Sequence, residues 1–149
     1  MNDDFKIGQL TKELVAMKLK ELEDPSAVAA GLVKKTIVVA LKAAAPDQAR
    51  AIVVDACYGG MQGLLLAEGD LAAGAVKLLE AVCEAAQDLG LDPGEMMRYG
   101  LTGVARIEKF AQAETLSAIR FALENRFSGV GEAFTDALAA ERKSDAQKV

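Results

Sequence analysis

Hydrophobic side chains recur along this chain at the three- and four-residue spacing of amphipathic α-helices. The spacing predicts helices over residues 4–23, 25–45, 46–68, 70–89 and 93–112, and a last one over 114–142. Proline or an Asp-Pro pair stands at three of the predicted starts, where proline is favoured at the first helical position. The chain has 149 residues, the size of one domain. We therefore expect an all-α, single-domain, up-and-down helical bundle of five or six helices.

Two glycines interrupt the last predicted helix. One apolar stripe runs from Leu116 to Ala137, straight through Ser128-Gly129-Val130-Gly131. Glycine lowers helix stability, so this helix is expected to be kinked or broken there and to end near Arg142. The sequence thus predicts a bundle over residues 1–142 and a frayed polar C-terminal tail over residues 143–149.

An uncharged segment, Ala56–Ala67, lies inside the third predicted helix and contains Gly59, Gly60 and Gly63. Each mid-helix glycine costs about 1 kcal/mol relative to alanine, or roughly 3 kcal/mol for three. Close packing, a bend or a ligand would offset that cost. We expect these glycines and Met61 to form a close helix contact, inside the bundle first and across a dimer interface second. A wall for an apolar ligand is the third alternative.

The same helix has only a narrow polar stripe. Its members are Asp47, Asp55, Tyr58 and Gln62. If Asp55 were buried, its raised pKa would suit proton transfer, with Tyr58 or Arg106 as its partner. The favoured alternative places Asp55 and Tyr58 on the solvent-exposed side of the helix.

Basic residues form one edge of the fifth predicted helix. They are Arg98, Arg106 and Lys109. We expect them to be solvated and to pair with acidic residues of the preceding helix, namely Glu80, Glu84 and Asp88. Such surface pairs contribute about 0–1 kcal/mol each, so this edge indicates a solvated face rather than an anion site.

The amino-acid composition excludes most of the common catalytic arrangements of side chains. The chain has no histidine and only two cysteines, so Ser-His-Asp and Cys-His arrangements are excluded, as is a histidine-assisted zinc site. The glycines near Gly59 lack the Lys-Ser/Thr of a phosphate-binding loop. No catalytic residue, cofactor or metal ligand set is predicted. Cys57 and Cys83 lie in apolar contexts and are expected to be buried free thiols in a reducing cytoplasm.

The net charge of the chain limits the classes of partner that it is expected to bind. The formal net charge is −5, whereas nucleic-acid binding normally needs a basic face. The start of the chain, Met1-Asn2-Asp3-Asp4, is acidic and does not resemble a signal peptide. No apolar run reaches the roughly 18–20 residues of a membrane span. We expect a cytoplasmic protein with no membrane span and no nucleic-acid partner.

Small size, acidity, alanine richness and helical amphipathicity together are similar to the phasins, which coat polyester storage granules. The resemblance covers composition and amphipathicity only, and would imply a coat on a hydrophobic surface. The helix starts at Asp24-Pro25, Pro46 and Asp92-Pro93 favour a packed globule instead of a loose coat.

Three functions follow as hypotheses. The leading one is a non-catalytic protein that acts through protein–protein contacts as a homo-oligomer, with a dimer as the first expectation. The predicted helices over 25–45 and 46–68 have more apolar surface than one bundle core uses, and such an excess marks interfaces. The alternative is a carrier or coat for a hydrophobic ligand or surface, with Met61 and Met96-Met97 as adaptable lining. The third is an enzyme that uses Asp55.

Overall fold

Helices make up all the regular structure in the part of the chain that the computed structural model describes, residues 12, 13, 15 and 24–147. The α-helices are α2 (Pro25–Ala43), α3 (Ala49–Leu66), α4 (Leu71–Leu89), α5 (Pro93–Ala105), α6 (Ala113–Arg126) and α7 (Val130–Gln147), with 3₁₀ turns η1 (Pro46–Gln48) and η2 (Arg106–Phe110). The all-α expectation is confirmed. The helix predicted over 4–23 lies outside the described residues, except for helical residues 12, 13 and 15.

The predicted helix starts depend on aspartate side chains. Asp24, Asp70 and Asp92 are the N-caps of α2, α4 and α5, and each accepts a backbone N–H at 3.1 Å. These bonds satisfy donors that the first helical turn leaves unpaired. At the other end of α4, Gly90 adopts a φ of 68°, a left-handed conformation that glycine adopts without strain. Local chemistry alone therefore sets these boundaries.

The last predicted helix is broken in two. α6 ends at Arg126 and α7 begins at Val130, with Gly129 at a φ of 86° between them. The predicted end of the second part is wrong, because α7 continues to Gln147 instead of stopping near Arg142. Residues 143–147 are therefore helical rather than a frayed tail. A salt bridge of 3.5 Å from Lys109 to Asp145 connects the last turns of α7 to η2.

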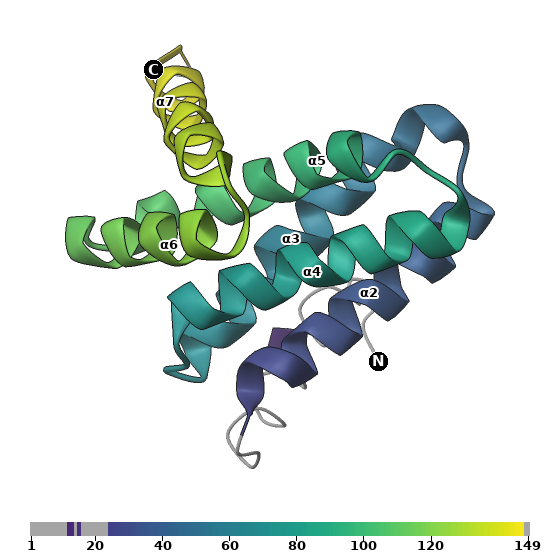
Figure 1. The fold of residues 1–149 in the computed structure, drawn as a ribbon, viewed down its shortest axis with the longest axis horizontal. Coiled ribbons are helices and arrows are strands. Elements are labelled where there is room, and N and C mark those ends of the chain that lie inside the picture. The colour runs from purple at the N-terminus through teal and green to yellow at the C-terminus, as the bar shows by residue number, and fades with distance from the viewer. Residues whose placement is uncertain (1–11, 14, 16–23, 148–149) are drawn as a thin grey trace, which may run out of the picture.

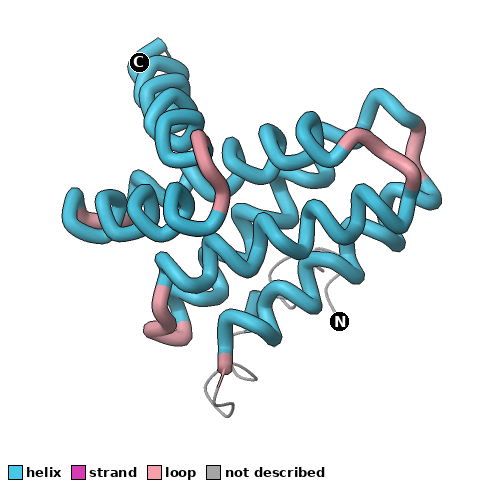
Figure 2. Tube along the Cα trace, viewed as in Figure 1, coloured by secondary structure: helices cyan, strands magenta, loops and turns pink. Residues whose placement is uncertain are grey.

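Four helices form the centre of the molecule. α2 and α5 each pack on both α3 and α4, and short loops connect successive helices (Figure 2). α6 packs on α4, and α7 contacts α5 and α6. Figure 1 shows α7 crossing steeply over the end of α6. α2 to α5 therefore follow the up-and-down order, whereas α7 lies across it.

The closest helix contact joins α5 to α3. A Cβ atom on Gly103 would overlap the carbonyl oxygen of Val54 and would lie 2.9 Å from the Cβ of Cys57. A Cβ on Gly100, one turn earlier, would lie 2.9 Å from Leu79 Cδ2. Glycine at both positions thus lets the backbone of α5 lie directly on α3 and α4.

Reciprocal charge pairs attach α7 to η2. They are Arg106–Glu141, Lys109–Asp145 and Arg142–Glu108. The pairing expected for this basic edge is therefore wrong for Arg106 and Lys109. The acidic residues of α4 pair elsewhere, with Lys34 on α2 and Arg126 on α6. Pairs between α4 and this edge were expected because the two segments are neighbours in the chain. Instead, Arg106 and Lys109 of η2 reach acidic residues of α7.

Glu124 near the end of α6 caps the start of α7. Its carboxylate accepts the backbone N–H of Gly129 at 3.0 and 3.2 Å and that of Gly131 at 3.0 Å. These bonds, that from Gly129 above all, favour the charged form and hold the pKa of Glu124 below its ordinary value of 4.5.

Gly103→Ala should destabilise the protein by about 1–3 kcal/mol, because the new methyl group meets rigid backbone of α3. Gly31→Ala is the matched control, since a Cβ at Gly31 in α2 would meet nothing within 4 Å. The control should be neutral or stabilise by up to about 1 kcal/mol. Chemical denaturation measures both variants. Equal stability of the two would contradict the close contact at Gly103.

Glu124→Gln should remove a pH-dependent part of the stability. Because the pKa of Glu124 is lowered in the folded state, its contribution is present above pH 4.5 and is lost as the pH falls through the folded-state value. The melting temperatures of the parent and the variant should therefore differ near neutral pH and converge in acid. Glu132→Gln, on exposed α7 surface, is the control. A difference that persists unchanged in acid would refute the cap.

Candidate functional site

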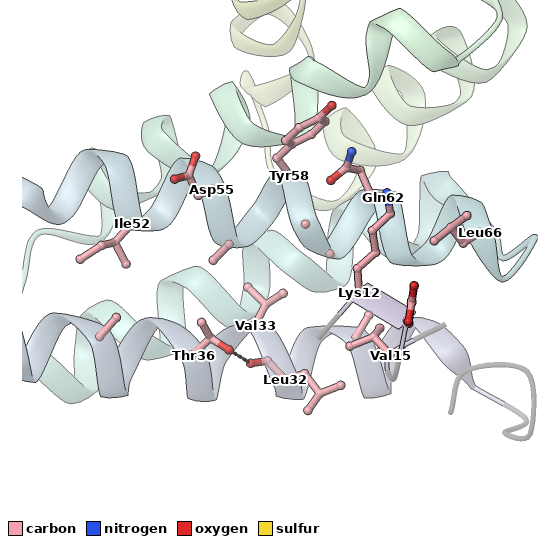
Figure 3. A pocket seen from close by; sticks show the side chains of 16 residues that line it. Lys12, Val15, Leu32, Val33, Thr36, Ile52, Asp55, Tyr58, Gln62 and Leu66 are labelled. Atoms are coloured by element: carbon pink, nitrogen blue, oxygen red, sulfur yellow. Dashed lines mark hydrogen bonds between the residues drawn. The ribbon is translucent and has the colours of Figure 1, made fainter. Parts of the chain in front are cut away.

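An open groove of about 970 Å³ runs between α2 and α3, beside the described residues of the N-terminal segment. Figure 3 shows it from close by, with α3 on one side and α2 on the other. The lining residues are Lys12, Glu13, Val15, Ala29, Leu32, Val33, Thr36, Ala40, Ile52, Asp55, Ala56, Tyr58, Gly59, Gly60, Gln62 and Leu66. Most of them are apolar or lack a side chain.

Helical periodicity produces both walls. On α3, Ile52, Ala56, Gly59 and Leu66 recur at helical spacing, so they form one stripe along the helix. At 1.5 Å per residue this stripe is about 21 Å long. The α2 wall is built from Ala29, Leu32, Val33, Thr36 and Ala40 in the same way. Two apolar stripes lie side by side, and the groove is the space between them.

Gly59 lies in this groove and not in a close helix contact. No described residue would lie within 4 Å of a Cβ atom at Gly59. A Cβ at Gly60 would lie 2.9 Å from Val33 Cγ2, and one at Gly63 would lie 3.0 Å from Val15 Cγ1. Gly59 and Gly63 lie on the same face of α3, one turn apart, whereas Gly60 is about 100° around the helix from Gly59.

The methionines proposed as ligand lining lie elsewhere. Met61 is fully buried in the core, so its close packing is confirmed, but it does not line the groove. Met96 is buried, Met97 is half-buried against the core, and neither lines the groove. The apolar lining opposite α3 comes from α2 instead. The sequence indicated this only through the excess of apolar surface on the helix predicted over residues 25–45.

Polar side chains of α3 form one rim of the groove. Asp55, Tyr58 and Gln62 extend on the same side of α3 in Figure 3, which agrees with the predicted polar stripe. The Asp55 side chain is 76% exposed and lies 3.6 Å from Arg106. The enzyme hypothesis required a buried Asp55 and therefore loses its basis. Neither Tyr58 nor Gln62 forms a hydrogen bond with another described residue, so both retain polar groups for other molecules.

The α2 wall, in contrast, offers a ligand no hydrogen-bond donor that lacks a partner. The hydroxyl of Thr36, its one polar side chain, donates to the carbonyl oxygen of Leu32 at 2.8 Å. Apart from Asp55, the charged lining residues are Lys12 and Glu13 of the N-terminal segment. Lys12 was not recognised from the sequence, because it is one of several lysines at regular spacing there.

The two cysteines are free thiols with different surroundings. Cys57 is fully buried under α5, and burial raises its pKa to about 12. The expectation of a buried, inert thiol is confirmed for Cys57. Cys83 on α4 is only half-buried. Burial raises its pKa, while the nearby Arg126 guanidinium opposes that shift.

Other kinds of site find no support within the described residues. In that part of the chain no group of three or more His, Cys, Asp or Glu side chains is placed to hold a metal ion. No helix there is long and apolar enough to cross a membrane. Comparisons with protein-family models, with curated proteins and with solved structures find no match for this chain.

Thiol alkylation of the native protein at neutral pH should modify Cys83 and spare Cys57, because only the thiolate reacts and Cys57 is buried with a pKa of about 12. Intact-mass and peptide mass spectrometry measure the order of labelling. In denaturant both thiols should react at similar rates. Labelling of Cys57 before Cys83 in the native state would contradict the packing of α5 on α3.

Proposed function

We propose that the protein is a non-catalytic carrier that binds an apolar ligand in the groove between α2 and α3. One observation carries the proposal: the predicted glycine contact at Gly59 is an open space of about 970 Å³ with mainly apolar walls. Ligand sites are typically concave, of roughly 300–1,000 Å³, and apolar with a few polar groups. The groove fits that description.

The distribution of polarity supports a ligand that is mostly hydrocarbon. One wall is apolar along its whole length, and the unpaired polar groups lie on the rim at Tyr58 and Gln62. Each methylene group that leaves water contributes about 0.8 kcal/mol. A rim group that exchanges a hydrogen bond with water for one with the ligand orients the ligand at little net desolvation cost.

Protein contact through the same surface is the second candidate, favoured by exposed leucines at the groove. Leu32 is 38% exposed and Leu66 is 47% exposed, and both line it. An apolar helix of another copy of this chain would cover them, as expected for a homodimer. In both cases the protein works without chemistry of its own, and a cytoplasmic location belongs to the proposal.

Gly59→Leu should fill the groove without disturbing the fold, because a Cβ at Gly59 meets nothing within 4 Å. We expect the parent to bind the neutral apolar dye N-phenyl-1-naphthylamine, and the variant to bind it at least about tenfold more weakly, a loss of roughly 1.4 kcal/mol. Fluorescence titration measures both. Light scattering on the same samples gives their mass.

Gly31→Leu is the matched control, since it places the same side chain at an open helix position outside the groove. It should bind the dye like the parent. Native mass spectrometry should find a co-purified apolar molecule on the parent and the control only. If the parent instead binds no dye and is a dimer that Gly59→Leu alone dissociates, the second candidate replaces the first. A monomer without dye binding would reject both.

A further inference from the structure

The groove is long. Its α3 wall extends about 15 Å from Gln62 to Ile52, at 1.5 Å per residue. The opposite wall on α2 runs from Leu32 to Ala40 and exposes no polar group that lacks a partner. A site of this shape fits an extended hydrocarbon chain better than a compact ring system.

Among the described residues, none obstructs the middle of the groove. Ala56 and Gly59 occupy the centre of the α3 wall, and a Cβ at Gly59 would still have open space around it. No large side chain of α3 therefore separates the Ile52 end from the Gln62 end. A single chain can pass along the entire wall in contact with small residues.

The polar contacts are concentrated at one end. Figure 3 shows Lys12 extending from the N-terminal segment toward Gln62. Lys12 forms no ion pair with a described residue, and the Gln62 amide forms no hydrogen bond with one. Together they supply an ammonium group and an amide N–H, and both can donate hydrogen bonds to a carboxylate.

The positive charge at this end limits the head group. Lys12 is the only cation among the described lining residues, and Asp55 on the rim already lies 3.6 Å from Arg106. A monoanion is what one ammonium group can neutralise.

We propose that the groove binds a long-chain fatty carboxylate. Its carboxylate lies between Lys12 and Gln62, and its chain runs past Gly59 toward Ile52. This inference rests on the proposed carrier function and names the class of ligand. It follows from the chemistry of the two ends of the groove.

The test compares cis-parinaric acid, a fluorescent fatty acid, with its methyl ester on the full chain. The parent should bind the acid about tenfold more tightly than the ester, a difference of roughly 1.4 kcal/mol, because only the acid carries the charge that Lys12 and Gln62 can bind. Lys12→Gln should weaken binding of the acid by about the same factor and leave the ester unchanged. Lys35→Gln, exposed on α2 outside the groove, is the control and should bind both probes like the parent.

Gln62→Ala is a second variant that should weaken binding of the acid without affecting the ester. Equal binding of acid and ester by the parent, or no effect of both Lys12→Gln and Gln62→Ala, would overturn the carboxylate assignment while the carrier function stands. Binding of neither probe would overturn both. Unchanged binding of the acid by Gly59→Leu would place the ligand outside this groove.

Discussion

The arrangement of this protein depends on how closely α5 can approach α3. At Gly103 the backbone of α5 lies against the carbonyl oxygen of Val54 with no room for a methyl group. That contact buries Cys57 completely and fixes one side of α3. α2 and α4 cover another side around Gly60, where Val33 and Leu78 approach closely. Because glycine removes the side chains that would separate these helices, α3 is held at the centre of the molecule.

The groove is the side of α3 that neither contact covers. α5 lies over Val54 and Cys57, and α4 with part of α2 lies over Gly60, while Ile52, Gly59 and Leu66 line the groove, with no described residue packed against Gly59. Exposed apolar stripes are unfavourable in water, and contiguous ones commonly mark a ligand or partner site. The groove therefore lies where it does because the other sides of α3 are covered by α4, α5 and part of α2.

Ion pairs join the outer helices, and on the α2 and α3 walls of the groove only Asp55 is charged. The pairs from α4 to Lys34 and Arg126 lie on exposed or partly exposed surface, where each contributes about 0–1 kcal/mol, whereas Glu141 and Glu108 in the pairs between η2 and α7 are only 14% and 17% exposed. These pairs connect α7 to η2 and α6 to α4. The hydrophobic core supplies most of the free energy of folding. Asp55 is tied to Arg106 on this outer network. It is therefore part of the rim and not a buried reactive group.

The sequence by itself determined the helices, their aspartate caps and the break at Gly129, because these depend on residues within one or two helical turns. It also singled out the glycines of α3 and the polar stripe of Asp55, Tyr58 and Gln62. Only the tertiary structure decided which glycine packs and which lies open. The reason is that a Cβ at Gly60 or Gly103 collides with atoms from another helix, and helix packing brings together residues far apart in the chain. The groove between α2 and α3 arises from that packing, as do the partners of Arg106 and Lys109.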